Sequence, residues 1–334
     1  MTSPIPTSAT RPPDWHLPAA LMVFIGNIIL CLCFFSPEVQ GYGDAVKGWG
    51  QFNHLLAGGE PYFSDHNQIS LRLGMAATTL VLVFGLSALG LIERRVLVTY
   101  LALPFAAYLA TKIKLEFLFF PFALISTRLS GKREAFVLFM ICFMSIYFEE
   151  NNGLVLICFR LLILGFRKIR LSWYWILAIV ATIVLIDANI EMLFSIFPRL
   201  SVYSWTRDIV NPEFSHLETV IVFASSMIIG IQPQIDYVLA FPYTLLILGL
   251  TVGPRLLSWR FYRETFNTPE FRAGFLTIML VTSLTHVFQN ARYYFYFVPG
   301  ITAIGGDRIN TVMILTSWPM TLGLVIFYGF ALGI

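Results

Sequence analysis

Charged residues are scarce in this chain. Asp, Glu, Lys and Arg make up 12% of its 334 residues, and 57% are apolar. A soluble domain carries about 25% charged residues, so this chain has too few charges to cover a water-facing surface. The net charge is only +3, and no block of Lys or Arg is present. Nucleic acid is therefore not an expected partner.

Sequence motifs for metals, disulfides and nucleotides are also missing. The four cysteines have neither the spacing of a zinc site nor that of a disulfide framework and lie inside apolar runs: Cys31, Cys33, Cys142 and Cys158. No Walker loop, HExxH or nucleophile-elbow sequence occurs. We predict no metal-ligand set and no required cofactor, although a bound divalent cation is compatible with the sequence.

Long apolar runs take the place of these motifs. LPAALMVFIGNIILCLCFF near the N-terminus and TVMILTSWPMTLGLVIFYGFALGI at the C-terminus are two of them. A membrane-spanning helix needs roughly 20 such residues, and hydrocarbon requires every backbone polar group to be bonded internally. We therefore predict an all-α polytopic membrane protein of about eleven transmembrane helices, with extracytoplasmic amphipathic helices. The expected helices are 17–35, 72–92, 96–111, 115–127, 135–148, 153–165, 172–187, 235–252, 273–289, 293–304 and 309–333.

The distribution of Lys and Arg predicts the orientation. Basic residues gather in alternate loops, among them 253–272, which is the pattern of loops that stay in the cytoplasm. Residues 1–16 then form a disordered cytoplasmic tail, and 17–334 form one transmembrane domain with large outer loops at 36–71 and 188–234. The segment 218–238 fits better as a re-entrant or outer-face interfacial helix, because a full crossing would move 253–272 outside.

The first outer loop carries the most distinctive pattern. Asp44 follows two glycines just beyond the first helix, and AVKGWGQFNHLLAGG continues with apolar residues at helical spacing. Such a stripe is typical of an amphipathic helix at a membrane interface. A turn, GGEPYFSD, ends this stretch.

The string GDAVKGWGQFNHLLAGGEPYF resembles the first extracytoplasmic loop of GT-C fold glycosyltransferases, most of all the branch that uses polyprenyl-phosphate-mannose. KIKLEFLFFPFALISTRLSGKRE and HVFQNARYYFYFVPGI are similar to two further stretches of that family. The resemblance implies an inverting transfer from a polyprenyl-phosphate donor to a lipid-linked glycan or another glycoconjugate. Asp44 occupies the family's position for the base that deprotonates the acceptor hydroxyl.

Several other polar residues are placed at the outer face by the predicted topology. The leaving group of this reaction is a phosphate, which cations stabilise, and we assign that role to Arg292, Lys114 and Lys112. Other residues are expected to contact the sugar or the acceptor. They come from the outer loops or lie within three residues of Arg292: His54, Asp65, His66, Glu149, Glu150, Asn151, Arg207, Gln289 and Tyr293. Each also has a plain structural explanation as a helix cap, a solvated turn or an interfacial anchor.

Two other functions remain open at this level. An O-antigen or exopolysaccharide polymerase would act on polyprenyl-diphosphate-linked oligosaccharides through outer arginines such as Arg199, Arg207 and Arg292. A transporter or lipid flippase is disfavoured because the chain shows no internal repeat. The expected partners are the lipid-linked sugar donor, a glycan or glycolipid acceptor and membrane lipids. The resemblance also implies a location in the bacterial inner membrane, with the active site on the extracytoplasmic side.

Overall fold

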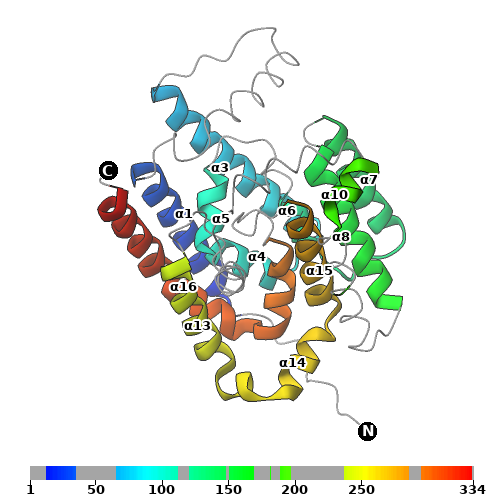
Figure 1. The fold of residues 1–334 in the computed structure, drawn as a ribbon. Coiled ribbons are helices and arrows are strands. Elements are labelled where there is room, and N and C mark those ends of the chain that lie inside the picture. The colour runs from blue at the N-terminus through cyan, green and yellow to red at the C-terminus, as the bar shows by residue number, and fades with distance from the viewer. Residues whose placement is uncertain are drawn as a thin grey trace.

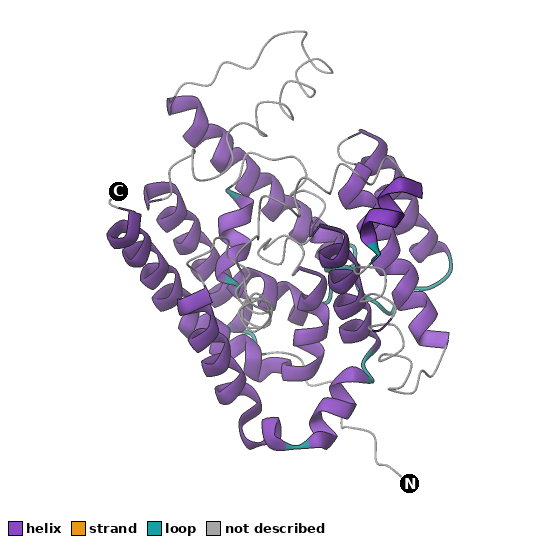
Figure 2. Ribbon diagram, viewed as in Figure 1, coloured by secondary structure: helices purple, strands orange, loops and turns teal. Residues whose placement is uncertain are grey.

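The computed structural model describes residues 13–34, 65–111, 120–147, 150–168, 181, 189–196, 237–285 and 295–332. These residues form helices joined by short loops, and no strand occurs among them (Figure 2). The all-α class predicted from the apolar runs is confirmed for this part of the chain.

The helices differ widely in length, from one turn to 35 residues. Their bounds in chain order are α1 His16–Phe34, α3 Asp65–Ala88, α4 Arg94–Ala102, α5 Pro104–Ala110, α6 Phe120–Ala123, α7 Lys132–Tyr147, α8 Glu150–Lys168, α10 Ile190–Ile196, α13 Tyr237–Val252, the 3-10 helix η4 Gly253–Leu257, α14 Trp259–Phe266, α15 Pro269–Thr285 and α16 Val298–Leu332.

One group of helices forms around α1, which packs against α4, α5 and α16. The C-terminal part of α16 runs parallel to α1, as Figure 1 shows. The Trp318 indole N–H donates to the Val23 carbonyl at 3.1 Å, and the Asn27 amide donates to Ser317 at 2.9 Å. This close approach needs Gly26, because a Cβ there would lie 2.6 Å from the Trp318 ring.

A second group consists of α7, α8 and α15, and α15 also packs against α16. Arg160 of α8 and Glu134 of α7 form a buried ion pair inside this group. The Arg160 Nη1 atom also donates to the Ile125 carbonyl at 2.9 Å. The pair therefore fastens α7, α8 and the turn after α6 to one another.

Sharp changes of direction occur where glycine or proline permits or imposes them. Gly306 adopts φ 55° and ψ −142° inside α16, a conformation that only glycine takes without strain. This kink separates the two helices predicted at 293–304 and 309–333. Pro104 begins α5 and holds Leu103 in an extended conformation, so the predicted helix 96–111 is divided into α4 and α5.

Three other predicted elements differ from the structure. Of the expected helix 115–127, only Phe120–Ala123 is helical among the residues described, because Ser126 leaves the helix to donate its N–H to the Leu91 carbonyl. The expected outer loop 36–71 ends early, since α3 begins at Asp65. The expected inner loop 253–272 contains η4 and α14. The predicted helix 172–187 (except residue 181) and the segment 218–236 lie outside the described residues.

Among the described helices, two are long and apolar enough to cross a membrane. The 18-residue windows His16–Cys33 and Leu71–Ala88 have mean hydropathies of 2.1 and 1.7. Length and composition of this kind suggest membrane association. Beside them, Gly153–Phe166 and Leu245–Leu257 are shorter apolar helices.

Candidate functional site

Few of the predicted site residues belong to the described part of the chain. Asp65 and His66 open the first turn of α3, and Glu150 and Asn151 open the first turn of α8. The residues expected in a polar turn between α7 and α8 are therefore partly helical. The other predicted site residues lie outside the described ranges: Asp44, His54, Lys112, Lys114, Glu149, Arg207, Gln289, Arg292 and Tyr293. The structure does describe the residues that border these segments and the contacts that they make.

Arg72 is the central feature of the end of the bundle where α1 and α5 finish and α3 begins. Its side chain extends from α3 and is only 2% exposed. The Nη2 atom donates to the Cys31 carbonyl at 2.8 Å, and Nε donates to the Thr111 carbonyl at 3.3 Å. We call this set, Arg72 with Cys31 and Thr111, the Arg72 junction.

Helix ends explain why an arginine is suited to this position. Cys31 lies in the last turn of α1, and Thr111 is the C-cap residue of α5. The last carbonyls of a helix have no partner within it and carry the negative end of the helix dipole. One buried guanidinium thus satisfies the ends of two helices with its fixed set of donors.

The Arg72 junction joins helix ends that border two segments to which site residues were assigned. The segment 35–64, which contains Asp44 and His54, connects α1 to α3. Lys112 is the next residue after Thr111, and Lys114 follows two residues later. The described residues that precede the predicted base and the two predicted phosphate ligands are therefore held at one place in the bundle.

A buried aromatic cluster joins the far ends of two such segments. The rings of Phe120 and Phe295 stack with centroids 4.9 Å apart, and the Tyr100 ring lies 5.6 Å from that of Phe295. Phe120 follows the segment that carries Lys114, and Phe295 is three residues beyond Arg292. The three rings are almost fully buried, so the stack fixes where both segments return to the core.

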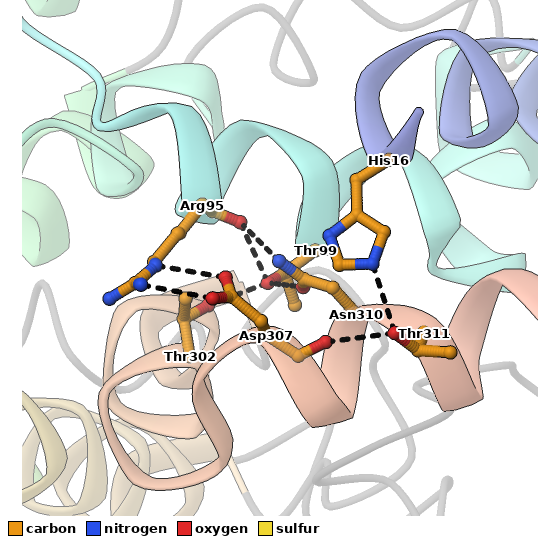
Figure 3. Close-up of polar contacts among 7 residues, drawn as sticks. All are labelled: His16, Arg95, Thr99, Thr302, Asp307, Asn310 and Thr311. Carbon is orange, nitrogen blue, oxygen red and sulfur yellow. Dashed lines mark hydrogen bonds and ion pairs between the residues drawn. The ribbon is translucent and has the colours of Figure 1, made fainter. Parts of the chain in front are cut away.

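A separate polar cluster lies at the end of the bundle where α1 begins, away from the Arg72 junction (Figure 3). We call this end of the bundle the His16 end. Arg95 of α4 forms a two-fold ion pair with Asp307, with N–O distances of 2.9 and 3.0 Å. Beside it, the Thr99 hydroxyl donates to the Asn310 amide oxygen at 2.6 Å. The His16 ring contacts the Thr311 hydroxyl at 2.9 Å. These groups mostly satisfy one another, so we interpret the cluster as the fastening of α1 and α4 to the kink in α16.

Sequence reasoning did not single out Arg72, although a signal was available. An ionisable residue within an apolar run of spanning length marks a functional or structural site, and Arg72 is the second residue of the apolar window Leu71–Ala88. The fastening role of Asp307 and Asn310 was missed because their partners, Arg95 and Thr99, are more than 200 residues away.

Within the described ranges, no three His, Cys, Asp or Glu side chains come together as metal ligands. That no cofactor is required stays a prediction, because most predicted site residues lie elsewhere in the chain.

Comparison of the chain with models of protein families, with curated proteins and with solved structures finds no match. The resemblance to GT-C glycosyltransferases is therefore supported only by the residues of this sequence.

Proposed function

We propose that this protein is a multi-pass membrane glycosyltransferase of the GT-C type in the bacterial plasma membrane. It would take a sugar from a polyprenyl-phosphate donor and transfer it to a lipid-linked glycan or another glycoconjugate on the extracytoplasmic face. The Arg72 junction is the observation that carries the proposal, because it joins the helix ends that border the segment with Asp44 and the segment with Lys112 and Lys114.

The distribution of apolar side chains supports a membrane location. Large apolar residues on the two apolar windows and on three other helices are exposed on the outside of the bundle: Met22 and Ile29, Val81, Phe139, Leu154 and Leu315. Charged residues such as Arg72 and Arg160 are buried inside it. A soluble protein shows the reverse arrangement. With the bundle set in lipid, exposed apolar side chains meet hydrocarbon and buried polar groups meet one another.

The positive-inside pattern supports the orientation. It assigns the His16 end to the cytoplasm, and the Arg72 junction then lies toward the extracytoplasmic surface. Asp65 and His66 open α3, and Glu150 and Asn151 open α8; we assign these four residues to the sugar and acceptor site on that side. His54, Glu149, Arg207, Gln289 and Tyr293 belong to the same proposed surface.

The proposed reaction is a single displacement at the anomeric carbon. The Asp44 carboxylate takes the proton of the acceptor hydroxyl as its oxygen forms the new bond to that carbon. The bond from the anomeric carbon to the phosphate oxygen breaks, and its electron pair leaves with polyprenyl phosphate. Arg292, Lys112 and Lys114 stabilise the charge that develops on the departing phosphate. The proton ends on Asp44, and the configuration is inverted.

The test is transfer of radiolabelled sugar by the purified protein, offered either polyprenyl-phosphate monosaccharides or polyprenyl-diphosphate oligosaccharides. The proposal expects product from a monosaccharide donor and an acceptor lipid extract. Product from the diphosphate oligosaccharides alone would instead identify a polymerase. Movement of labelled lipid across vesicle membranes without any new glycosidic bond would identify a transporter or flippase.

A further inference from the structure

The connection between α13 and α15 has a surface that the proposed transfer reaction does not use. It consists of η4 and α14, residues Gly253–Phe266, and we call it the 253–266 strap. Figure 1 shows the strap lying across one end of the bundle. That end is the His16 end, to which the kink in α16 belongs. Thr251, two residues before the strap, lies beside this kink, because a Cβ on Gly305 would be 3.1 Å from the Thr251 side chain.

The strap presents large apolar side chains to its surroundings. Leu257 is 92% exposed and Trp259 is 71% exposed, and Tyr262 is exposed beside them. No residue of η4 is buried, and Thr265 is the one buried residue of α14. Phe266 turns inward, with its ring 5.2 Å from that of Phe271. The strap is therefore held to the core at its C-terminal end and leaves Leu257, Trp259 and Tyr262 exposed.

Positive charge accompanies these apolar residues. The strap contains Arg255, Arg260 and Arg263 against a single acidic residue, Glu264. Arg260 pairs with Glu264 at 2.8 Å. Within the described part of the chain, Arg255 and Arg263 form no ion pair. Arg255 instead lies 6.0 Å from the centre of the Phe261 ring. Two arginines thus remain available for an anion.

We propose that the 253–266 strap binds anionic phospholipid headgroups in the membrane leaflet at the His16 end. Exposed Trp, Tyr and Leu side chains together with unpaired arginines are the composition of an interfacial helix, whose aromatic and apolar groups enter the boundary of the acyl chains while the cations contact phosphate. The strap lies across the end of the bundle, where the proposed orientation puts the headgroup layer. The proposal rests on the membrane location in the proposed function but is independent of the transferase activity.

The charged part is tested with the full-length protein in detergent, by native mass spectrometry of bound phosphatidylglycerol and phosphatidylcholine. Each arginine near an anionic headgroup changes the affinity by about fivefold. Arg255→Gln with Arg263→Gln should therefore lower the affinity for phosphatidylglycerol by roughly 25-fold. The double variant Arg255→Lys with Arg263→Lys keeps the charge and should stay near wild type, which separates lipid binding from folding.

The matched control removes two exposed charges that start α7 at the same end, Lys132→Gln with Arg133→Gln. It should change the affinity for phosphatidylglycerol less than about threefold, because the start of α7 lacks the exposed Trp and Tyr side chains of the strap. Equal losses in the control and in the strap variant would overturn the proposal. So would equal retention of the two lipids by the wild type, or full competition by free glycerol phosphate.

The apolar part is tested in nanodiscs that contain phosphatidylglycerol brominated on its upper acyl carbons. The fluorescence of Trp259 is taken as the difference between wild type and Trp259→Phe. We expect the brominated lipid to quench most of the fluorescence that Trp259 contributes. An unquenched difference would place Trp259 in water and overturn the proposal, whatever the result of any transfer assay.

Discussion

The guanidinium of Arg72 donates a 2.8 Å hydrogen bond to the carbonyl oxygen of Cys31, which lies 41 residues earlier in the chain. A second bond from the same side chain reaches Thr111 at 3.3 Å. The ends of two helices, α1 and α5, thus depend on one buried side chain of α3. This dependence makes Arg72 a positioning residue in the proposed enzyme, since it holds the helix ends that border residues 35–64 and 112–119 without a direct part in the chemistry.

Arg72→Met should destabilise the protein and slow sugar transfer. Loss of the guanidinium leaves two buried carbonyls unpaired, at about 1–3 kcal/mol each. Thermal unfolding in detergent measures the first effect, and steady-state transfer measures the second. Arg72→Lys should recover part of the stability, because one ammonium group cannot match both carbonyl directions. Unchanged stability and transfer in Arg72→Met would contradict the positioning role.

Gly26→Ala should lower stability by about 1–3 kcal/mol, because the added methyl group overpacks the contact between α1 and α16. Its Cβ would lie 2.6 Å from the Trp318 ring, whereas a Cβ on Gly85 of α3 would meet nothing within 4 Å. Gly85→Ala is the matched control and should be neutral or slightly stabilising. Denaturation curves of the two variants in one detergent give the comparison, and equal shifts would refute the close approach.

Glu134→Gln should be among the most damaging substitutions of a charged residue. It leaves the Arg160 guanidinium buried without its counter-charge, at about 3–5 kcal/mol. Glu93→Gln serves as the comparison, because Glu93 pairs with the largely exposed Arg128 at 3.9 Å and such surface pairs contribute about 0–1 kcal/mol. The measured quantity is the yield of folded, monodisperse protein together with its unfolding temperature. Similar behaviour of the two variants would count against the buried pair.

The Arg95–Asp307 pair should show measurable coupling. A double-mutant cycle with Arg95→Gln and Asp307→Asn should give about 1 kcal/mol, because the pair is two-fold and only partly exposed. The Arg94–Asp14 pair is the comparison: its atoms are 3.4 Å apart and the Asp14 side chain is 84% exposed. A cycle on that pair should give a coupling energy near zero, and a larger value there than at Asp307 would contradict the fastening role of the cluster.

Local patterns in the sequence predicted most of the described helices. Apolar runs placed α1, α7, α8 and α13 within a few residues of their observed bounds. The division of α16 at Gly306 was anticipated as the gap between two expected helices. The division at Pro104 was missed, although proline at the start of a helix and an extended residue before it are local signals.

Local sequence patterns could not predict which residues contact one another in the folded chain. Nothing next to Arg72 in the sequence shows that its partners are carbonyls at Cys31 and Thr111, because helix packing brings these groups together. The α14 helix was missed because its eight residues carry more charge than an apolar window tolerates. Of the predicted site, Asp65, His66, Glu150 and Asn151 are described as first-turn residues of helices, and the role of each stays a prediction.

The most direct measurement is sugar transfer from the polyprenyl-phosphate donor by wild type, Asp44→Asn and Asp65→Asn under identical conditions. General-base catalysis contributes about 10²–10⁴-fold to a rate. We therefore expect Asp44→Asn to lose at least about a hundredfold in the rate constant for transfer while its donor affinity stays unchanged. Asp65→Asn should retain activity within about tenfold, as expected of a substrate contact. Wild-type activity in Asp44→Asn would remove this carboxylate from the mechanism and contradict the proposed reaction.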